Sequence, residues 1–377
     1  MRILINTLAI LSSGTGIGKC TYYIAKKLKE IDNKNSYYYY YGYYSQKILD
    51  IRKFLFLQST LDKFRKLIRK MPFVFWFKKL AYYFMITEKF EFDIYFEPNF
   101  VLLEKIKAKK RIVFVYDFSF DLYPEWHPDD RVLYLRENFW RSIKRADRVI
   151  LPSNFIYEEA VNKFNFEKSI LRIVYLGVDQ DIFKKYPTDL VEKVCKKYRL
   201  PKNFILFVGS IEPRKNLRNL LLAYELLPPY IKNEFSLVLV GFSGWKNENI
   251  MKIIKKNQNR IIYTGYVPEN ELALIYNKAS VFVFPSFYEG FGLPPLEAMA
   301  CGCPVIVSNT GSLPEICGNA ALYCNPYDPQ DIAKAIYELI KSEDFRNYFI
   351  EKGLERVKFF LWDKTAEGIL KIMEEIL

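Results

Sequence analysis

The sequence predicts an α/β protein made of two doubly wound domains that face each other across a cleft. The 377 residues are too many for one ordinary core, so two domains are expected. Apolar runs of strand length alternate with stretches of helical periodicity, a pattern typical of a parallel sheet covered by helices. The alternation begins again near Asn203, which indicates that each half of the chain builds its own sheet.

The first series predicts an N-terminal domain over residues 1–180. A strand at Arg2–Leu11 leads into a glycine-rich turn at 13–18 and a helix from Lys19 to about Ile31. The tyrosine run Tyr37–Tyr44 is expected to be a strand, because aromatic residues favour strands. Further buried strands are expected at Asp93–Phe96, Arg111–Tyr116, Val149–Leu151 and Ile170–Tyr175.

The second series predicts a domain over residues 181–357, after a boundary between Gly177 and Pro201. A last helix is expected to start near Trp362, within residues 358–377. Ligands of doubly wound sheets bind at the carboxyl ends of the strands, so the site is expected between the domains. The elements expected here are strands Phe204–Val208, Ser236–Val240, Ile261–Tyr263, Val281–Phe284 and Pro304–Val307, and helices Asn219–Leu227 and Glu269–Asn277.

Composition restricts the class of protein. Half the residues are apolar and 17% are aromatic, which argues against disorder. The net charge of +13 indicates an acidic partner, either nucleic acid, anionic lipid or a phosphorylated substrate. Six scattered cysteines and a single histidine, His127, argue against a structural metal and favour reduced thiols in a cytosolic protein. No apolar stretch has the pattern of a signal peptide or a spanning helix, so a soluble or peripheral protein is expected.

Residues 47–90 differ from the rest of the chain. They contain eleven Lys and Arg against three Asp and Glu, interleaved with aromatic residues. This pattern predicts either a segment lying on an anionic membrane surface or a core helix with a solvated basic face. The sequence leaves both interpretations open.

The run Glu289–Glu297 carries the strongest chemical signal. It follows a predicted strand and opens a predicted helix, with Glu297 in the first turn. The backbone N–H groups of Phe291, Gly292 and Leu293 are then free at a helix N-terminus, which favours a phosphate. Two carboxylates on either side of a phosphate site suit the hydroxyls of a nucleotide sugar.

Arg214 and Lys215 directly follow the strand Phe204–Val208. At a strand end the pair is placed to clamp a diphosphate, with Arg as a two-pronged donor and Lys as a point charge. An ordinary solvated loop is the alternative. Backbone groups around Val267, after a later strand, are placed to pair with a nucleobase edge.

The N-terminal loop admits three interpretations. A phosphate-binding Walker loop would need Gly at Ser13 and a hydroxyl residue at Cys20. The glycines of this loop also lack the spacing of a dinucleotide-binding motif. A flexible glycine loop that closes over an anion at the helix N-terminus requires fewer exceptions.

The order of these motifs resembles the retaining GT-B glycosyltransferases of family 4, many of which are bacterial mannosyl- and other hexosyltransferases of surface polysaccharides. The resemblance covers nearly the whole chain, and it implies that the last helix, within residues 358–377, crosses back onto the first domain. Beyond the motifs above it rests on Val115–Glu125, Pro152–Asn154, Gly177–Asp179, Ala300–Ile306 and Gly311–Glu315.

The resemblance implies transfer of a hexose, with mannose favoured, from a nucleotide diphosphate sugar with retained configuration. Arg214 and Lys215 would bind the diphosphate and stabilise its leaving charge. Glu289 would contact the transferred sugar, and Glu297 the ribose. Gly16 would lie over the donor, and the backbone from Phe291 through Gly292 to Leu293 would hold its sugar and phosphate. The departing diphosphate is expected to receive the acceptor proton, so no protein base is assigned.

The acceptor side departs from the family pattern. The family commonly has His-Asp where this chain has Tyr116 and Asp117, and that histidine lies beside the reacting sugar. Tyr116 keeps a hydroxyl but is not a cation near neutral pH. His127 lies eleven residues further on and receives no role from the sequence.

The implied partners are a GDP-mannose or UDP-sugar donor and a glycan or lipid-linked acceptor, with no metal, no other cofactor and no nucleic acid. The implied location is cytoplasmic or peripheral at the inner face of the membrane. Two other functions are a P-loop-like nucleotide hydrolase and a basic nucleic-acid-binding protein, each of which requires more exceptions.

Overall fold

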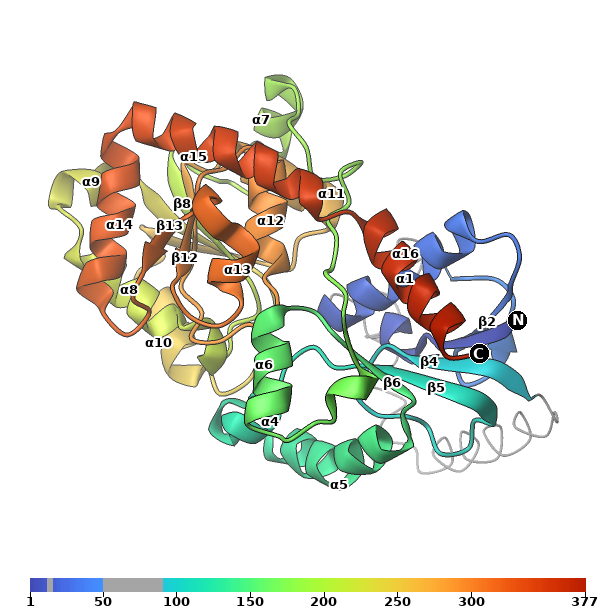
Figure 1. Cartoon of the computed structure of the whole chain (residues 1–377). Coiled ribbons are helices and arrows are strands. Elements are labelled where there is room, and N and C mark those ends of the chain that lie inside the picture. The colour runs from blue at the N-terminus through green and yellow to red at the C-terminus, as the bar shows by residue number, and fades with distance from the viewer. Residues whose placement is uncertain (12–15, 50–90) are drawn as a thin grey trace, which may run out of the picture.

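The computed structural model describes residues 1–11, 16–49 and 91–377, which form two α/β lobes joined side by side (Figure 1). The first lobe is built on a sheet of order β3-β2-β1-β4-β5-β6-β7, parallel except for the β2–β3 pair. Its strands are β1 Arg2–Asn6, β2 Ser36–Tyr40, β3 Tyr44–Ser45, β4 Phe92–Glu97, β5 Ala108–Phe114, β6 Arg148–Leu151 and β7 Leu171–Ile173.

Helices cover this first sheet, and the sheet order reverses between β1 and β4. Strands β1 and β4 are adjacent in the sheet although β2 and β3 separate them in the chain. Such a reversal opens a crevice at the strand ends. The helical elements are η1 Leu8–Leu11, α1 Gly16–Ile31, α4 Ser119–Leu122, η2 Pro124–Trp126, α5 Asp129–Arg145, α6 Asn154–Asn162 and η3 Lys168–Ile170.

The second lobe has an all-parallel sheet of order β10-β9-β8-β11-β12-β13, which reverses between β8 and β11. All residues of β8 and β11 are buried, as expected for strands covered on both faces. The strands are β8 Phe204–Val208, β9 Ser236–Val240, β10 Ile261–Gly265, β11 Val281–Phe284, β12 Val305–Ser308 and β13 Leu322–Cys324.

The helices of the second lobe surround this sheet, and α16 leaves it to lie beside α1 on the first lobe (Figure 1). Lys27 of α1 pairs with Asp363 of α16 at 3.1 Å. The helical elements are α7 Thr188–Lys197, η4 Pro213–Lys215, α8 Leu217–Leu226, α9 Pro229–Glu234, α10 Glu248–Lys256, α11 Glu269–Lys278, α12 Leu293–Ala300, α13 Leu313–Cys317, η5 Gly318–Ala320, α14 Pro329–Lys341, α15 Glu343–Arg356, η6 Val357–Phe359 and α16 Trp362–Glu375.

The two segments that link the lobes touch each other. The Val178 N–H donates to Phe360 O at 3.0 Å. A side chain at Gly177 would place its Cβ 2.1 Å from Trp362 N, so the backbones meet too closely for any residue but glycine.

Three element predictions near the N-terminus were wrong in their bounds. The first strand ends at Asn6, because the Thr7 hydroxyl and N–H both bind Tyr40 O and the chain then enters η1. The tyrosine run is two strands, separated by a turn at Gly42 with φ 89°. Helix α1 begins at Gly16, three residues before the predicted start.

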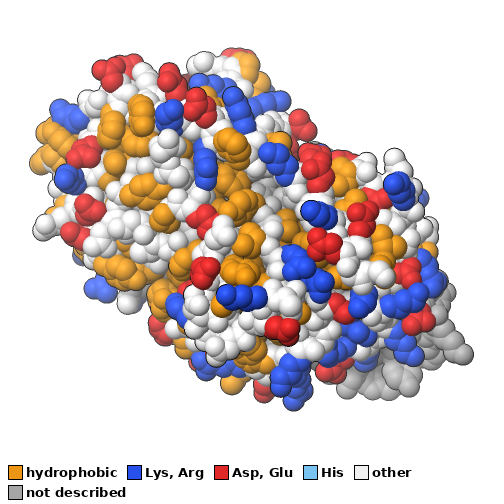
Figure 2. Space-filling model, in the orientation of Figure 1, with side chains coloured by type: hydrophobic (Ala, Val, Ile, Leu, Met, Phe, Trp, Pro, Cys, Tyr) orange, Lys and Arg blue, Asp and Glu red, His pale blue; other side chains and the backbone are white. Residues whose placement is uncertain are grey.

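The surface charge is mixed on the face drawn in Figure 2, where basic and acidic side chains are interspersed and hydrophobic side chains gather at the waist between the lobes. A nucleic-acid-binding face would show a continuous basic stripe. The basic segment 50–90 lies outside the described residues, so the membrane and core-helix interpretations both stay predictions. Among the described residues, no helix is long and apolar enough to cross a bilayer.

The predicted core cysteines are confirmed as buried, unpaired thiols. All six are buried and none forms a disulfide. Burial raises the pKa of each thiol above its ordinary value, to about 12 for Cys317. These side chains therefore act as small apolar core residues.

Candidate active site

The predicted clamp lies at the reversal point of the second sheet. Arg214 and Lys215 form η4 after β8, and Glu289 lies in the loop after β11, the strand next to β8. Asn216, in the left-handed region at φ 58°, fixes this turn because its side-chain amide donates to Pro285 O and Pro326 O at 2.9 and 2.7 Å. Topology thus brings together residues that are 74 positions apart.

The Glu289 carboxylate binds both cations of the clamp. Its Oε2 accepts from Arg214 Nη1 at 2.7 Å, and its Oε1 accepts from Lys215 Nζ at 2.6 Å. Arg214 also donates to Glu212 Oε1 at 3.1 Å. Two cations and two carboxylates therefore form one compact cluster, with all four side chains at most 15% exposed.

Burial and pairing shift the pKa values of this cluster in different directions. Burial alone would raise the pKa of Glu289, but Arg214 and Lys215 outweigh it and hold that pKa at about 2. Burial and the neighbouring Arg214 lower the pKa of Lys215, against the attraction of Glu289. With a pKa of about 2, Glu289 is ionised near neutral pH and presents a fixed negative charge between the two basic side chains.

The loop from Glu289 to α12 is held by glycines and by the first lobe. Gly292 precedes the helix at φ 118°, a conformation that favours glycine. A Cβ at Gly290 would meet Tyr116 O of the first lobe at 1.9 Å. Ser153, also of the first lobe, donates its hydroxyl to Gly290 O at 2.8 Å. The predicted phosphate-binding turn is therefore also a contact between the lobes.

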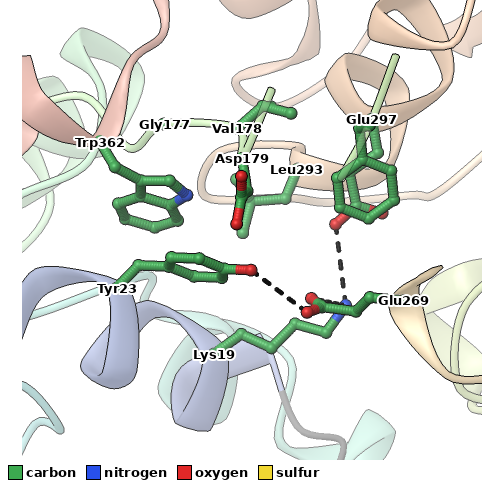
Figure 3. Close-up of a pocket in the computed structure, with 10 residues that line it drawn as sticks. Lys19, Tyr23, Gly177, Val178, Asp179, Glu269, Leu293, Glu297 and Trp362 are labelled. Atoms are coloured by element: carbon green, nitrogen blue, oxygen red, sulfur yellow. Dashed lines mark hydrogen bonds and ion pairs between the residues drawn. The ribbon is translucent and has the colours of Figure 1, made fainter. Parts of the chain in front are cut away.

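Glu297 lies in the second turn of α12, not in the first turn as predicted, because it is the fifth residue of a helix with 3.6 residues per turn. Its side chain faces a narrow pocket lined by α1, α11, α12, α16 and the linker between the lobes (Figure 3). Lys19 Nζ lies 2.8 Å from Glu269 Oε1 and 3.8 Å from Glu297 Oε1. The Tyr23 hydroxyl donates to Glu269 at 3.2 Å, and the Tyr23 ring stacks on Trp362.

The pocket has charges of both signs. Burial would lower the pKa of Lys19, but Glu297 and Glu269 outweigh it and raise that pKa. Burial raises the pKa of Glu297, which Lys19 opposes. Lys19 of the first lobe thus faces two carboxylates of the second lobe, Glu269 and Glu297. Glu297 is the residue predicted to contact the ribose of the donor.

The side chains of the predicted acceptor residues, Tyr116 and Asp117, point in different directions. The Tyr116 hydroxyl is buried beside the Cys20 thiol, and its ring stacks on Phe114, so the side chain faces the first lobe's core. Asp117 lies nearer the clamp, with its Cβ 3.1 Å from the position a Gly290 side chain would take. The structure therefore brings Asp117, but not the Tyr116 hydroxyl, toward the Glu289 loop.

The remaining predicted residues do not line the pocket beside Glu297. Gly16 begins α1, directly after residues 12–15, which are outside the described part of the chain. Val267 is buried at the start of the loop that leads to Glu269. Phe291 is buried and packs edge-on against Phe360 of the crossing segment. Their roles toward a ligand stay predictions.

Sequence reasoning missed the contacts that join the lobes. Glu315 caps helix α6 of the first lobe, accepting from Asn154 N at 2.8 Å and Phe155 N at 2.9 Å. Trp245 Nε1 donates to Trp126 O at 2.6 Å. Both Asn154 and Glu315 belong to motifs that supported the family resemblance, but no spacing rule connects residues 161 positions apart.

Two lobes, each built on a doubly wound and largely parallel sheet, form the GT-B architecture of glycosyltransferases. The fold agrees over the full chain with sucrose-phosphate synthase from Thermosynechococcus elongatus (TM-score 0.71, 18% identity, 100% of this chain and 99% of that one). Anabaena HepE in complex with UDP and glucose gives the same TM-score and identity and is covered over its full length. These likenesses establish the architecture.

The chain belongs to glycosyltransferase family 4. Residues 35–182 match the family Glycosyltransferase Family 4, and residues 192–356 match Glycosyl transferases group 1. The chain is 36% identical over 276 residues to O-antigen chain mannosyltransferase B of Escherichia coli, covering 72% of each protein. It is 32% identical over 256 residues to the serotype-specific mannosyltransferase WbdA of Escherichia coli, over 66% of this chain but only 31% of that protein. Family membership decides against the P-loop hydrolase and the nucleic-acid-binding protein.

Proposed function

We propose that this glycosyltransferase moves mannose from a nucleotide diphosphate mannose, GDP-mannose first, to a hydroxyl of a growing surface glycan or lipid-linked oligosaccharide, with retained anomeric configuration. The similarity to an O-antigen chain mannosyltransferase over 72% of both chains carries the choice of sugar and acceptor class. It acts at the cytoplasmic side of the membrane, soluble or peripheral.

The clamp performs the electrostatic part of the reaction. As the sugar–phosphate bond breaks, negative charge grows on the diphosphate, and Arg214 and Lys215 stabilise it inside a cleft of low exposure. Before the donor binds, Glu289 and Glu212 compensate these cations. An entering diphosphate displaces Glu289 from the clamp, and the freed carboxylate accepts hydroxyls of the transferred sugar.

Glu289 and Glu297 contact different parts of the donor. Glu289 lies with the clamp in the loop after β11, and Glu297 lies in α12, beside Lys19 and Glu269. The free N–H groups at the α12 start lie between them and suit a phosphate. No residue is assigned as general base, because the leaving diphosphate takes the acceptor proton. No metal is required in this scheme.

The test is an activity screen with the purified chain. GDP-mannose, UDP-glucose, UDP-galactose, ADP-glucose and dTDP-sugars are each supplied with a mannose-terminated oligosaccharide, with and without EDTA. We expect transfer from GDP-mannose, resistance to EDTA, and an α-linked product by NMR. Transfer from a UDP-sugar alone would contradict the choice of donor, and loss of transfer in EDTA would contradict the metal-free scheme.

A further inference from the structure

The single histidine of the chain is joined to Asp117 through one hydroxyl. His127 Nε2 lies 2.9 Å from Ser119 Oγ, and this hydroxyl donates to Asp117 Oδ1 at 2.6 Å. The Ser119 N–H donates to the same carboxylate oxygen at 2.9 Å. His127 and Ser119 are both buried, so solvent does not compete for these bonds.

The direction of these bonds fixes the tautomer of His127. Because the Ser119 proton goes to the carboxylate, the hydroxyl oxygen must accept from His127, and Nε2 must carry the ring proton. The other nitrogen, Nδ1, is buried and has no hydrogen-bond partner among the described residues. A buried polar atom left unpaired costs about 1–3 kcal/mol, so it calls for an explanation in a native fold.

The surroundings keep His127 neutral. Burial, and after it the nearby Arg131, lower the pKa of His127 to about 4, against the attraction of Asp117. Arg214 and Lys246 of the second lobe act in the same direction as Arg131. A neutral ring with its proton on Nε2 is a fixed single donor to Ser119.

We propose that His127 is a positioning residue for Asp117, acting through the Ser119 hydroxyl, and that the carboxylate held in this way receives a hydroxyl of the glycan acceptor. This inference rests on the proposed glycosyl transfer. His127 and Ser119 hold Asp117 in place on the acceptor side. The Tyr116 hydroxyl does not serve there, because it faces the core.

The geometry explains why the carboxylate needs this support. Asp117 follows β5 at the edge of the first lobe and packs against Gly290, next to Glu289 of the clamp. Ser119 donates two hydrogen bonds to Asp117 Oδ1, one from its hydroxyl and one from its N–H. Among the described residues, no group donates a hydrogen bond to Oδ2. One oxygen is thus anchored and the other is left for a ligand. A displacement of about 1 Å at such a group lowers turnover by up to roughly 100-fold.

Three variants and one matched control test the proposal. Ser119→Ala breaks the connection, His127→Phe removes the donor but keeps ring bulk, and His127→Gln keeps a donor at the position of Nε2. The control is Ser142→Ala, because Ser142 is also a buried first-lobe serine, with Oγ bonds to Leu102 N and Asn138 O in α5.

We expect Ser119→Ala and His127→Phe to lower acceptor kcat/KM on the order of 10- to 100-fold, with the donor KM changed less than about threefold. His127→Gln should stay within about threefold of wild type, and Ser142→Ala should match wild type per folded molecule. Equal losses in His127→Phe and Ser142→Ala, or no rescue by His127→Gln, would overturn the proposal.

A measurement without substrate separates this proposal from the proposed function. With only one histidine, ¹⁵N labelling of histidine gives a single pair of ring signals. We expect the Nε2–H tautomer across pH 5.5–8 and a change of these signals in Asp117→Asn. An Nδ1–H tautomer overturns the connection whatever the activity. A wild-type chain that transfers no sugar but shows the expected tautomer refutes the proposed function and leaves the connection supported.

Discussion

Lys215 Nζ donates to Glu289 Oε1 at 2.6 Å, which joins the turn after β8 to the loop after β11. With Arg214 and Glu212 the cluster contains two positive and two negative groups, so its formal charges cancel. A diphosphate adds negative charge, and the cluster accommodates it best when Glu289 swings away. In the proposed function, donor binding and release of Glu289 are therefore one exchange of ion pairs.

Lys215→Ala removes one of the two basic side chains of the clamp, while Arg214 still pairs with Glu289. We expect kcat to fall roughly 100- to 1,000-fold, because the lost group stabilises charge that develops in the transition state. Lys202→Ala, an exposed lysine of the same lobe, is the control and should leave kcat unchanged. Steady-state kinetics with correction for folded fraction measure this. A kcat within threefold of wild type would show that Lys215 has no clamp role.

Glu289→Gln and Glu297→Gln should separate in their effects on the donor. Glu297→Gln should weaken binding of the free nucleoside diphosphate by roughly 10-fold, because a hydrogen bond to a charged group contributes about 1.5–3 kcal/mol. Glu289→Gln should bind the nucleotide as well as wild type or better, since it no longer neutralises the clamp, but should lower kcat. Isothermal titration with GDP and kinetics with the full donor measure the two effects. The reverse pattern would exchange the two assignments.

Glu315→Ala should loosen the two lobes. The carboxylate caps α6 across the lobe boundary and also accepts from the Tyr175 hydroxyl at 2.8 Å. We expect a loss of about 1–2 kcal/mol in unfolding free energy and a larger radius of gyration in X-ray scattering. Ser342→Ala removes a cap that lies wholly within the second lobe, where Ser342 accepts from Phe345 N. That control should lose similar stability without a change of size; equal radii in both variants would refute the tie between lobes.

The sequence predicts the parts of this molecule that depend on local pattern. Helix α12 begins at Leu293 as expected, because the Gly-Leu-Pro-Pro run allows little else. Lys215 and Glu289 were both identified, since each follows a strand whose carboxyl end lies at a sheet edge. Their direct pairing was not predicted, because it depends on strand order, which no local pattern encodes. The connection of His127 to Asp117 was not predicted either, because it depends on the path of the chain through α4 and η2.

Glu97 should make the stability of the protein fall as the pH rises. It ends β4, is 1% exposed, and accepts from Asn6 Nδ2 at 2.6 Å. Burial raises the pKa of Glu97 from 4.5 to about 8, although hydrogen bonds from Tyr95 and Asn6 oppose the shift. A carboxyl whose pKa is raised by folding stabilises the native state fully below about pH 4.5, and this contribution is lost as the pH rises through about 8.

Glu97→Gln keeps the shape and the acceptor oxygen without the titrating proton. We expect it to resemble wild type at pH 5 and to exceed wild type by roughly 2–4 kcal/mol in unfolding free energy at pH 9. Glu91→Gln, an exposed residue just before β4, should follow the wild-type curve. Urea unfolding at pH 5, 7 and 9 gives the three curves. If Glu97→Gln and wild type run parallel across this range, the buried carboxyl is not the group that titrates.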